Sequence, residues 1–565
     1  MADFDAIVVG SGLSGGWVAK ELCERGLKVL VLDRGDNVEP AKDYSDMLEP
    51  WQKPHLDQVS PEVMQSDFSI QGGNYALKAS NKHLWMTDSD QPYEAVGGKF
   101  KWRRGSTIGG KSLMWGRASY RLAPYDFEVN KIDGEGVDWP VRYKDIAPWY
   151  DRVEKFVGIA GDRDGMAQLP DGEHFLPAFE HTCVEKKLKK EMAQSYDNRR
   201  LIMGRVANLT RLTEEQRALG RGQCQARNHC FHGCTYGAYF SSVSATLPAA
   251  KKTGNMTLVP NSIVTELVFD STSEKIKAVN VIDSRTRQTT SYSGKIFFLN
   301  AGTISTTLLM LRSASESMPN GLANSSEQLG RNFMDHIGGS KVEAKIEGFA
   351  DSYYYGRRPI GAYIPRYRNF PDRKENYKRG WGYQVYSGRV GAGGWKAGVG
   401  KAFKETNNRP GQWSIMLDHF GECLPYATNR VTSHQNRTDK WGHPIAVINL
   451  QLGKNEKALM RAAHADAIDI LTQAGFGNIS EVEKPDDFME GIAGRTHYMG
   501  TARMGRDPRT SVLNGWNQAH DIPNLFVTDG SFMASSACQN PSLTFMAFSA
   551  RAAHHAADLL SEGNL

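Results

Sequence analysis

The stretch that decides the fold is FDAIVVGSGLSGGWVAKELCERGLKVLVLDRGD, residues 4–36. Its residues 6–9 are apolar, as expected for a strand buried in a parallel sheet. A helical segment with an apolar face follows, and a second apolar run at 29–32 ends in Asp33. The sequence therefore predicts a strand, a tight turn, a helix and a second strand, which begin an α/β domain.

Three glycines, Gly10, Gly12 and Gly15, fill the turn with the spacing G-x-G-x-x-G. The first permits the tight turn, the second lets a pyrophosphate approach the backbone, and the third lets helix and strand pack closely. The helix N-terminus offers N–H groups to phosphates, and Asp33 is placed to accept hydrogen bonds from a ribose. With the strand, the helix and Asp33 in register, the pattern predicts a dinucleotide site; the alternative is a glycine-rich turn in an unrelated α/β unit. It does not choose between NAD and FAD.

Composition excludes several classes of protein. The chain has 565 residues, enough for two or three domains, and its net charge of +5 gives no case for nucleic acid. No apolar segment is long enough to span a bilayer, so we expect a chain that is not itself membrane-spanning. The first strand begins almost at Met1, so we expect no signal peptide.

A second glycine-rich segment is GSTIGGKSLMWGRAS, residues 105–119, in which Gly109 and Gly110 let the backbone pass close to a flat or anionic group. With the N-terminal motif, it resembles the second flavin signature of the glucose–methanol–choline (GMC) oxidoreductases. Ser112 belongs to the same flavin-binding segment. Several relatives join a histidine here covalently to the flavin, whereas this sequence has Met114. The resemblance therefore implies FAD held non-covalently.

Three of the seven cysteines, Cys224, Cys230 and Cys234, fall within eleven residues with the spacing C-x5-C-x3-C. An odd count with such crowding favours a metal site over a disulfide framework. The spacing leaves three alternatives open: an iron–sulfur cluster that lacks one iron, a zinc site completed by His229 or His232, or inert thiols. In a GMC chain the pattern resembles the flavin subunits of bacterial sugar dehydrogenases, which carry FAD and a [3Fe-4S] cluster.

The resemblance covers nearly the whole chain and implies a fold class: α/β, with a GMC-type FAD-binding Rossmann-like domain and a substrate domain built on a mainly antiparallel sheet. We expect residues 1–337 and 490–565 to form the discontinuous FAD-binding domain, with a surface excursion at 37–95 and the iron–sulfur segment at 222–239. Alternating apolar patterns at 338–489 predict the substrate-binding domain, and glycines and charges at 391–412 indicate a mobile loop. Aromatic residues of this range suit either a sugar site or the core: Tyr353 to Tyr355, Trp381, Tyr383, Tyr386 and Trp413.

Further flavin contacts follow from the resemblance. It implies that the backbone of Val264 lies beside the adenine, that Ala301 forms a turn after a buried strand, and that Asp529 and Gly530 contact the flavin phosphate or ribityl chain. Pro541 begins a helix whose positive end would face the flavin ring.

The resemblance implies a catalytic pair, His497 and Asn540. A neutral imidazole suits the removal of a hydroxyl proton near neutral pH, and Asn540 would orient the substrate oxygen. Among the other histidines, His336 and His419 are rivals for the role of base.

The expected function is therefore oxidation of a sugar or glucoside, with C3 of a glucoside as the first choice. Glucose at C1, fructose, sorbitol and gluconate are alternatives within the same group. Relatives of this kind imply a small Tat-exported hitchhiker subunit, a c-type cytochrome acceptor and periplasmic location by co-export, although a cytoplasmic location fits equally well. Other classes are an oxidase like the pyranose oxidases, an NAD-dependent dehydrogenase, and an electron-transfer module with a vestigial pocket.

Overall fold

The computed structural model describes all residues except 1–2, 228, 355–359, 390–397, 409–410 and 490–493. The first sheet has the strand order β5-β2-β1-β8-β7-β6, with β16 also paired to β8. The pairs that join β5, β2, β1, β8 and β16 are parallel, and those of β6, β7 and β8 are antiparallel. The strand bounds are β1 Phe4–Val9, β2 Val29–Leu32, β5 Met256–Val259, β6 Ser262–Asp270, β7 Lys275–Asp283, β8 Thr289–Leu299 and β16 Leu525–Val527.

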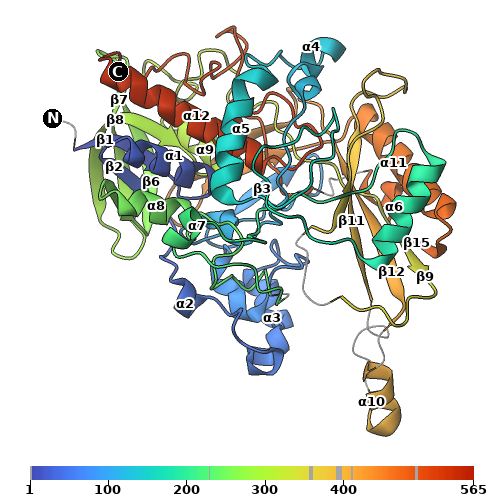
Figure 1. Cartoon of the computed structure of the whole chain (residues 1–565). Helices are drawn as coiled ribbons and strands as arrows, with labels where there is room; N and C mark the ends of the chain where they lie inside the picture. The colour runs from blue at the N-terminus through green and yellow to red at the C-terminus, as the bar shows by residue number, and fades with distance from the viewer. Residues whose placement is uncertain (1–2, 228, 355–359, 390–397, 409–410, 490–493) are drawn as a thin grey trace.

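Helices cover this sheet because the strands at its centre are apolar on both faces. Val8 and Val31 pack against α1 (Leu13–Glu24), α8 (Thr246–Lys252) and α12 (Ser542–Ser561). The helices α1 and α12 lie side by side, with α5 (Tyr143–Val157) next to α12 (Figure 1). The predicted buried parallel strands and the Rossmann-like domain are confirmed.

The second sheet is antiparallel, with the order β15-β9-β12-β11-β10-β4. Its outer face is covered by α6 (Cys183–Ser195) and α11 (Lys454–Gln473), which bring Leu188 and Leu459 into its core (Figure 1). This confirms the predicted antiparallel sheet. The strand bounds are β4 Ile202–Met203, β9 Lys341–Ile346, β10 Ala362–Ile364, β11 Trp381–Arg389, β12 Trp413–Gly421 and β15 Gly477–Glu483.

A third sheet joins distant parts of the chain. β13 (Arg430–Thr438) pairs with β14 (Pro444–Asn449), and β14 pairs in parallel with β3 (Tyr93–Val96). The alternating pattern at 443–452 thus predicts a strand correctly, but this strand lies outside the six-stranded sheet. Two elements of the range 1–337, β4 and α6, pack with the six-stranded sheet. The division of the chain into two domains at 337/338 stays a prediction.

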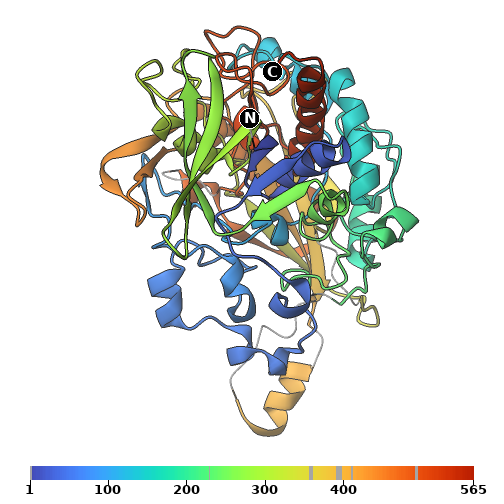
Figure 2. The same cartoon turned by 90° about the vertical axis from the view of Figure 1, so that its left-hand side faces the viewer.

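The remaining elements are short. The excursion at 37–95, blue in Figures 1 and 2, packs on the cysteine segment through hydrogen bonds such as that from the Ser45 amide to the His232 carbonyl, at 3.0 Å. The other helices are α2 Pro40–Asp43, α3 Pro61–Asp67, α4 Val129–Asp133, α7 Glu214–Ala218, α9 Thr303–Arg312 and α10 Gly400–Asn408. The 3-10 helices are η1 Pro50–Gln52, η2 Pro54–Asp57, η3 Ala79–Leu84, η4 Gly110–Leu113, η5 Pro124–Phe127, η6 Pro485–Phe488 and η7 Gly530–Phe532.

The loop predicted at 391–412 lies partly outside the described residues, and its described middle forms α10. Among the helices of the described chain, none has the length and apolar character needed to cross a membrane.

Candidate active site

A cavity of about 800 Å³ lies between the first sheet and the open face of the second. One wall is formed by the turn after β1, by η4 and by the start of α9. The opposite wall comes from alternate residues of β11 and β12, because side chains alternate across a strand. These residues are Gln384 and Tyr386 on β11 and Met416, Asp418 and Phe420 on β12.

The glycines of the first turn show where a ligand fits. Gly10 has a φ of +97°, and a Cβ on Gly15 would lie 1.8 Å from the Gly10 carbonyl oxygen. At Gly12, which precedes α1, a Cβ would meet only the Gly109 carbonyl oxygen, at 3.8 Å. Gly10 and Gly12 line the cavity, whereas Gly15 does not. The backbone of the turn is therefore packed closely against α1 at Gly15 and is open toward the cavity at Gly12. This leaves room for the phosphates of a dinucleotide to approach the backbone.

Asp33 ties this turn to the second glycine segment. Its carboxylate accepts hydrogen bonds from the Ser11 amide and the Gly35 amide, each at 2.9 Å, and from the Ser11 hydroxyl. The Ser11 oxygen in turn accepts from the Gly109 amide at 2.9 Å. Asp33, Gly110 and Ser112 line the cavity, whereas the predicted contact Gly109 does not. A network of hydrogen bonds thus fixes both segments in one arrangement.

The other predicted flavin contacts meet at the same cavity, which Val264, Ala301, Asp529 and Gly530 line. Asp529 accepts hydrogen bonds from the Gly302 amide at 2.9 Å and the Ser531 amide at 3.0 Å. Burial raises the pKa of this carboxyl group. The carboxylate holds the start of α9 against η7, so both elements present their backbone to the cavity.

The N-terminus of α12 also reaches the cavity. Pro541 precedes the first turn of the helix, and Pro541, Ser542 and Phe545 line the wall. The first amides of a helix have no partner within it, and its dipole is positive at this end. This end of α12 therefore favours negative charge in the cavity.

The predicted catalytic residues lie together. Asn540 Nδ2 is 3.3 Å from His497 Nε2, and both side chains line the cavity. Gln384 Nε2 donates a hydrogen bond to Asn540 Oδ1 at 2.9 Å. Because its oxygen is occupied by Gln384, Asn540 turns its amide N–H groups toward His497 and the cavity.

A second imidazole fixes the tautomer of His497. His336 Nε2 lies 3.3 Å from the Ser536 carbonyl oxygen, and its Nδ1 lies 2.8 Å from His497 Nδ1. A carbonyl only accepts, so His336 carries its proton on Nε2, and its Nδ1 accepts the proton of His497 Nδ1. His497 Nε2 is left with a lone pair that faces Asn540. The pattern leaves His497 Nε2 able to accept a proton, and the hydrogen bond to His336 orients the ring.

Burial keeps both rings neutral. It lowers the pKa of His336 to about 4. Burial also lowers the pKa of His497 well below 6.5, together with the positive charges of Lys111, of Arg495 and of His336 once that ring is protonated. Asp335 accepts hydrogen bonds from the amides of His497 at 2.8 Å and Thr496 at 3.1 Å, which holds the backbone that carries the base. His419, the other rival, is buried and does not line the cavity.

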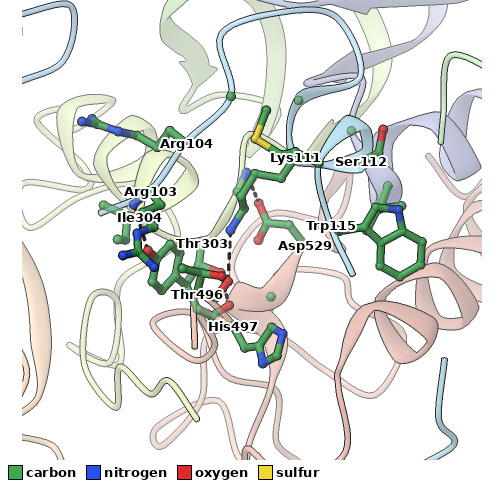
Figure 3. Close-up of a pocket in the computed structure, with 18 of the residues that line it drawn as sticks. Arg103, Arg104, Lys111, Ser112, Trp115, Thr303, Ile304, Thr496, His497 and Asp529 are labelled. Atoms are coloured by element: carbon green, nitrogen blue, oxygen red, sulfur yellow. Dashed lines mark hydrogen bonds between the residues drawn. The ribbon is translucent and has the colours of Figure 1, made fainter. Parts of the chain in front are cut away.

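Lys111 is a site residue that sequence reasoning missed. Its Nζ donates to the Thr496 carbonyl at 3.2 Å and lies 4.4 Å from the centre of the Tyr498 ring, beside His497 (Figure 3). Burial lowers its pKa to about 8, while Asp335 opposes this shift. Its position directly after Gly109 and Gly110 was the signal available in the sequence. Lys111 adds a positive charge to the wall of the cavity.

The aromatic residues expected at the substrate site divide between core and cavity. Trp381, Tyr383 and Trp413 are buried in the core of the six-stranded sheet, and Tyr386 lines the cavity. Tyr353 and Tyr354 lie outside the cavity lining, and Tyr355 lies outside the described residues. Other aromatic residues that line the cavity come from distant segments: Tyr75, Trp85, Trp102, Trp115, Phe420, Tyr498 and Phe545.

The cysteine segment lies outside the cavity lining. Cys224, Cys230 and Cys234 are half-buried and form no disulfide with any described cysteine. Within the described residues, no group of three or more His, Cys, Asp or Glu side chains is arranged to hold a metal ion. The segment therefore has the donor chemistry of a metal site without an assembled geometry, and the cluster stays a prediction.

The surroundings of the cysteines fit an anionic group. The Arg117 side chain is fully buried beside them, and its Nε and Nη1 have no hydrogen-bond partner among the described residues. The two candidate zinc ligands make other contacts: His229 Nδ1 lies 2.8 Å from the Asp46 carbonyl oxygen, and His232 Nε2 lies 2.6 Å from Asp57.

Family models described as GMC oxidoreductase match residues 4–338 and 425–549 of the chain. The chain belongs to the GMC oxidoreductase family. Fructose dehydrogenase large subunit from Gluconobacter japonicus is 27% identical over 99% of this chain and 98% of its own length. 2-Methyl-1,2-propanediol dehydrogenase from Mycolicibacterium austroafricanum is also 27% identical, over 97% of this chain and 94% of its own. Among solved structures, pyridoxine 4-oxidase from Mesorbium loti has a TM-score of 0.63 at 17% identity, covering 98% of this chain and 99% of that one.

This GMC oxidoreductase is therefore an FAD-dependent enzyme that acts on CH–OH groups. The fit of the first turn to a dinucleotide and the neutral base at the other end of the cavity agree with that assignment.

Proposed function

We propose that this protein is the flavin subunit of a sugar dehydrogenase, which oxidises a secondary hydroxyl of a sugar or glucoside, with C3 of a glucoside as the first choice. The observation that carries the proposal is the His336–His497–Asn540 arrangement, in which a neutral imidazole lone pair and an amide donor face the cavity together. The choice of C3 rests on the resemblance of the C-terminal segment QNPSLTFMAFSARAA, residues 539–553, to glucoside 3-dehydrogenases. Glucose at C1, fructose, sorbitol and gluconate remain alternatives.

The chain's own residues divide the work. His497 Nε2 takes the hydroxyl proton, and Asn540 Nδ2 donates a hydrogen bond to the same oxygen and so orients its carbon. When bound, FAD supplies the hydride acceptor, which no side chain can provide. Lys111 and the N-terminus of α12 place positive charge at the cavity, which would stabilise the negative charge that a transferred hydride adds there.

The open face of the second sheet supports a polar substrate. Gln384 and Tyr386 line it, and the Tyr386 hydroxyl donates a hydrogen bond to Gln384 Oε1 at 2.6 Å. Arg495, which is ion-paired with Asp418, lies on the same wall. A sugar needs polar groups that hydrogen-bond its hydroxyls and apolar rings that contact its carbon face. This wall provides both, with an amide, a phenol and an ion pair beside aromatic rings.

The proposal includes a [3Fe-4S] cluster on Cys224, Cys230 and Cys234, a c-type cytochrome as acceptor, a small Tat-exported subunit and a periplasmic location. The match to a fructose dehydrogenase large subunit supports a multi-subunit assembly. Exposed apolar side chains on the excursion that packs on the cysteine segment support a protein acceptor at this face. They are Met47, Trp51, Leu56 and Tyr75, which are 56%, 75%, 66% and 65% exposed.

Anaerobic purification followed by titration tests the proposal. We expect a flavin spectrum, iron and acid-labile sulfide, and bleaching of the flavin by methyl glucoside with a 3-keto product identified by NMR. Glucose and fructose serve as competing substrates. Stoichiometric hydrogen peroxide in air would instead indicate the oxidase alternative, and bleaching by no sugar would contradict the proposal.

The variant His497→Ala tests the base. We expect it to keep FAD and to lose sugar-driven bleaching by about 10²- to 10⁴-fold, the usual contribution of a general base. Reduction by dithionite is the control, because it needs no base. A variant that sugar reduces as fast as the parent protein would exclude His497 from the proton transfer.

A further inference from the structure

Two buried arginines flank the cysteine segment without an acidic partner. Arg117 and Arg221 are 0% and 3% exposed. Neither guanidinium forms an ion pair with a carboxylate in the described part of the chain. A buried charge without a counter-charge is strongly unfavourable, so each of these cations needs an anion nearby.

Arg117 lies between the cavity and the cysteines. Its Nη2 makes long hydrogen bonds to the carbonyl oxygens of Leu113, at 3.3 Å, and Cys230, at 3.4 Å. The guanidinium stacks on the Tyr239 ring, 3.4 Å from its centre. Its Nε and Nη1 have no partner among the described residues. Stacking offsets part of the cost of burial but leaves the charge without an anion.

Arg221 holds the other side of the segment. Its Nε donates to the Gly237 carbonyl at 3.0 Å, its Nη1 to the Val157 carbonyl at 2.9 Å, and its Nη2 to the Ala238 carbonyl at 3.5 Å. The Gly237 amide is itself hydrogen-bonded to the Cys234 carbonyl at 2.7 Å. Arg221 therefore fixes the turn after Cys234, and every partner that it has is a neutral carbonyl. Unlike Arg117, it does not line the cavity.

We infer that Cys224, Cys230 and Cys234 hold a net-anionic metal–sulfur centre whose charge is balanced by Arg117 and Arg221, and that these arginines raise its reduction potential. Neutral thiols would leave both guanidiniums unbalanced. Metal binding deprotonates thiols, so the same event supplies the anions that the arginines lack. The inference rests on the cluster of the proposed function and adds the residues that set its charge.

The ligand class follows from the donors. Three thiolates in one short segment suit soft metals and iron–sulfur centres. Because the buried cations favour the form of the centre that carries more negative charge, they favour its reduced state. Removal of either cation should therefore make the centre harder to reduce.

The experiment uses the anaerobically purified full chain, with its flavin, in the variants Arg117→Gln, Arg221→Gln and Arg221→Lys. Arg217→Gln is the matched control, because Arg217 is an exposed arginine on the neighbouring helix α7. Iron, zinc, acid-labile sulfide and FAD are measured for each protein, and the midpoint potential of the centre is measured by a redox titration followed by electron paramagnetic resonance.

We expect the two Gln variants to lower the equilibrium constant for reduction at least tenfold, which corresponds to about 59 mV for one electron. Arg221→Lys should retain most of the parent potential, and Arg217→Gln all of it. If one Gln variant does not fold, the other still provides the test. An unchanged potential in a folded Gln variant of an iron-containing parent would overturn the inference and leave the proposed function intact. A parent that contains zinc, or no metal, would overturn both the inference and the proposed cluster.

Discussion

At the scale of single residues, the arrangement of His336 and His497 determines which nitrogen acts as the base. The hydrogen bond between their Nδ1 atoms, at 2.8 Å, leaves His497 Nε2 unprotonated toward Asn540. We expect His336→Phe to slow flavin reduction by sugar by about 10²-fold, since a wrong tautomer removes the base. His336→Gln, which can still accept a proton from His497 Nδ1, should be less affected.

The pH dependence of the rate distinguishes an orienting role of His336 from a purely structural one. His336 is among the causes that lower the pKa of His497, after burial. Catalysis needs the neutral ring, so activity is lost as the pH falls through that lowered pKa. Removal of His336 should raise this pKa and move the acid limb of the rate profile to higher pH. A limb that stays at the parent position would exclude the assigned role.

At the scale of elements, the turn between β1 and α1 provides a matched pair of glycines. Gly12→Ala places a methyl group at the cavity, where its one contact in the protein is the Gly109 carbonyl oxygen at 3.8 Å, so we expect a folded protein that has lost most of its FAD. A Cβ on Gly477 in β15 meets no atom within 4 Å, and Gly477 lies far from the turn in sequence, so Gly477→Ala should keep FAD. The ratio of flavin absorbance to protein checks both. Full FAD content in Gly12→Ala would show that the phosphates bind elsewhere.

The same elements show what sequence can predict. β1, α1 and β2 are adjacent in the chain, and their contacts depend on glycine spacing and apolar runs, so residues 4–36 predict them correctly. The partner of β14 is β3, about 350 residues away, and no local pattern encodes that pairing. For the same reason, the pattern of β11 predicts a strand but does not show that Gln384 would orient Asn540.

At the scale of the whole molecule, buried ion pairs join the segments that carry the two walls of the cavity. Arg366 binds Asp126 of η5 at 2.6 Å and also Glu422, which follows β12. Gln539, next to Asn540, donates to the same Asp126 at 2.9 Å. The network therefore holds the second sheet and the catalytic loop in one position.

Asp126→Asn should lower the free energy of unfolding by about 3–5 kcal/mol, because it removes one of the two buried carboxylates that balance the charge of Arg366. Urea denaturation measures the change. Asp507→Asn is the control, since Asp507 pairs with Arg509 on the surface and its loss should not be measurable. Equal midpoints for the two variants would mean that the network adds nothing to stability.

The cavity is lined both by the turn after β1 and by the first residues of α12, which are separated by almost the entire chain. During synthesis the ribosome releases the first of these segments long before the second. The coenzyme's pocket is therefore incomplete until the segment that carries α12 has been synthesised, so we expect flavin loading to come late.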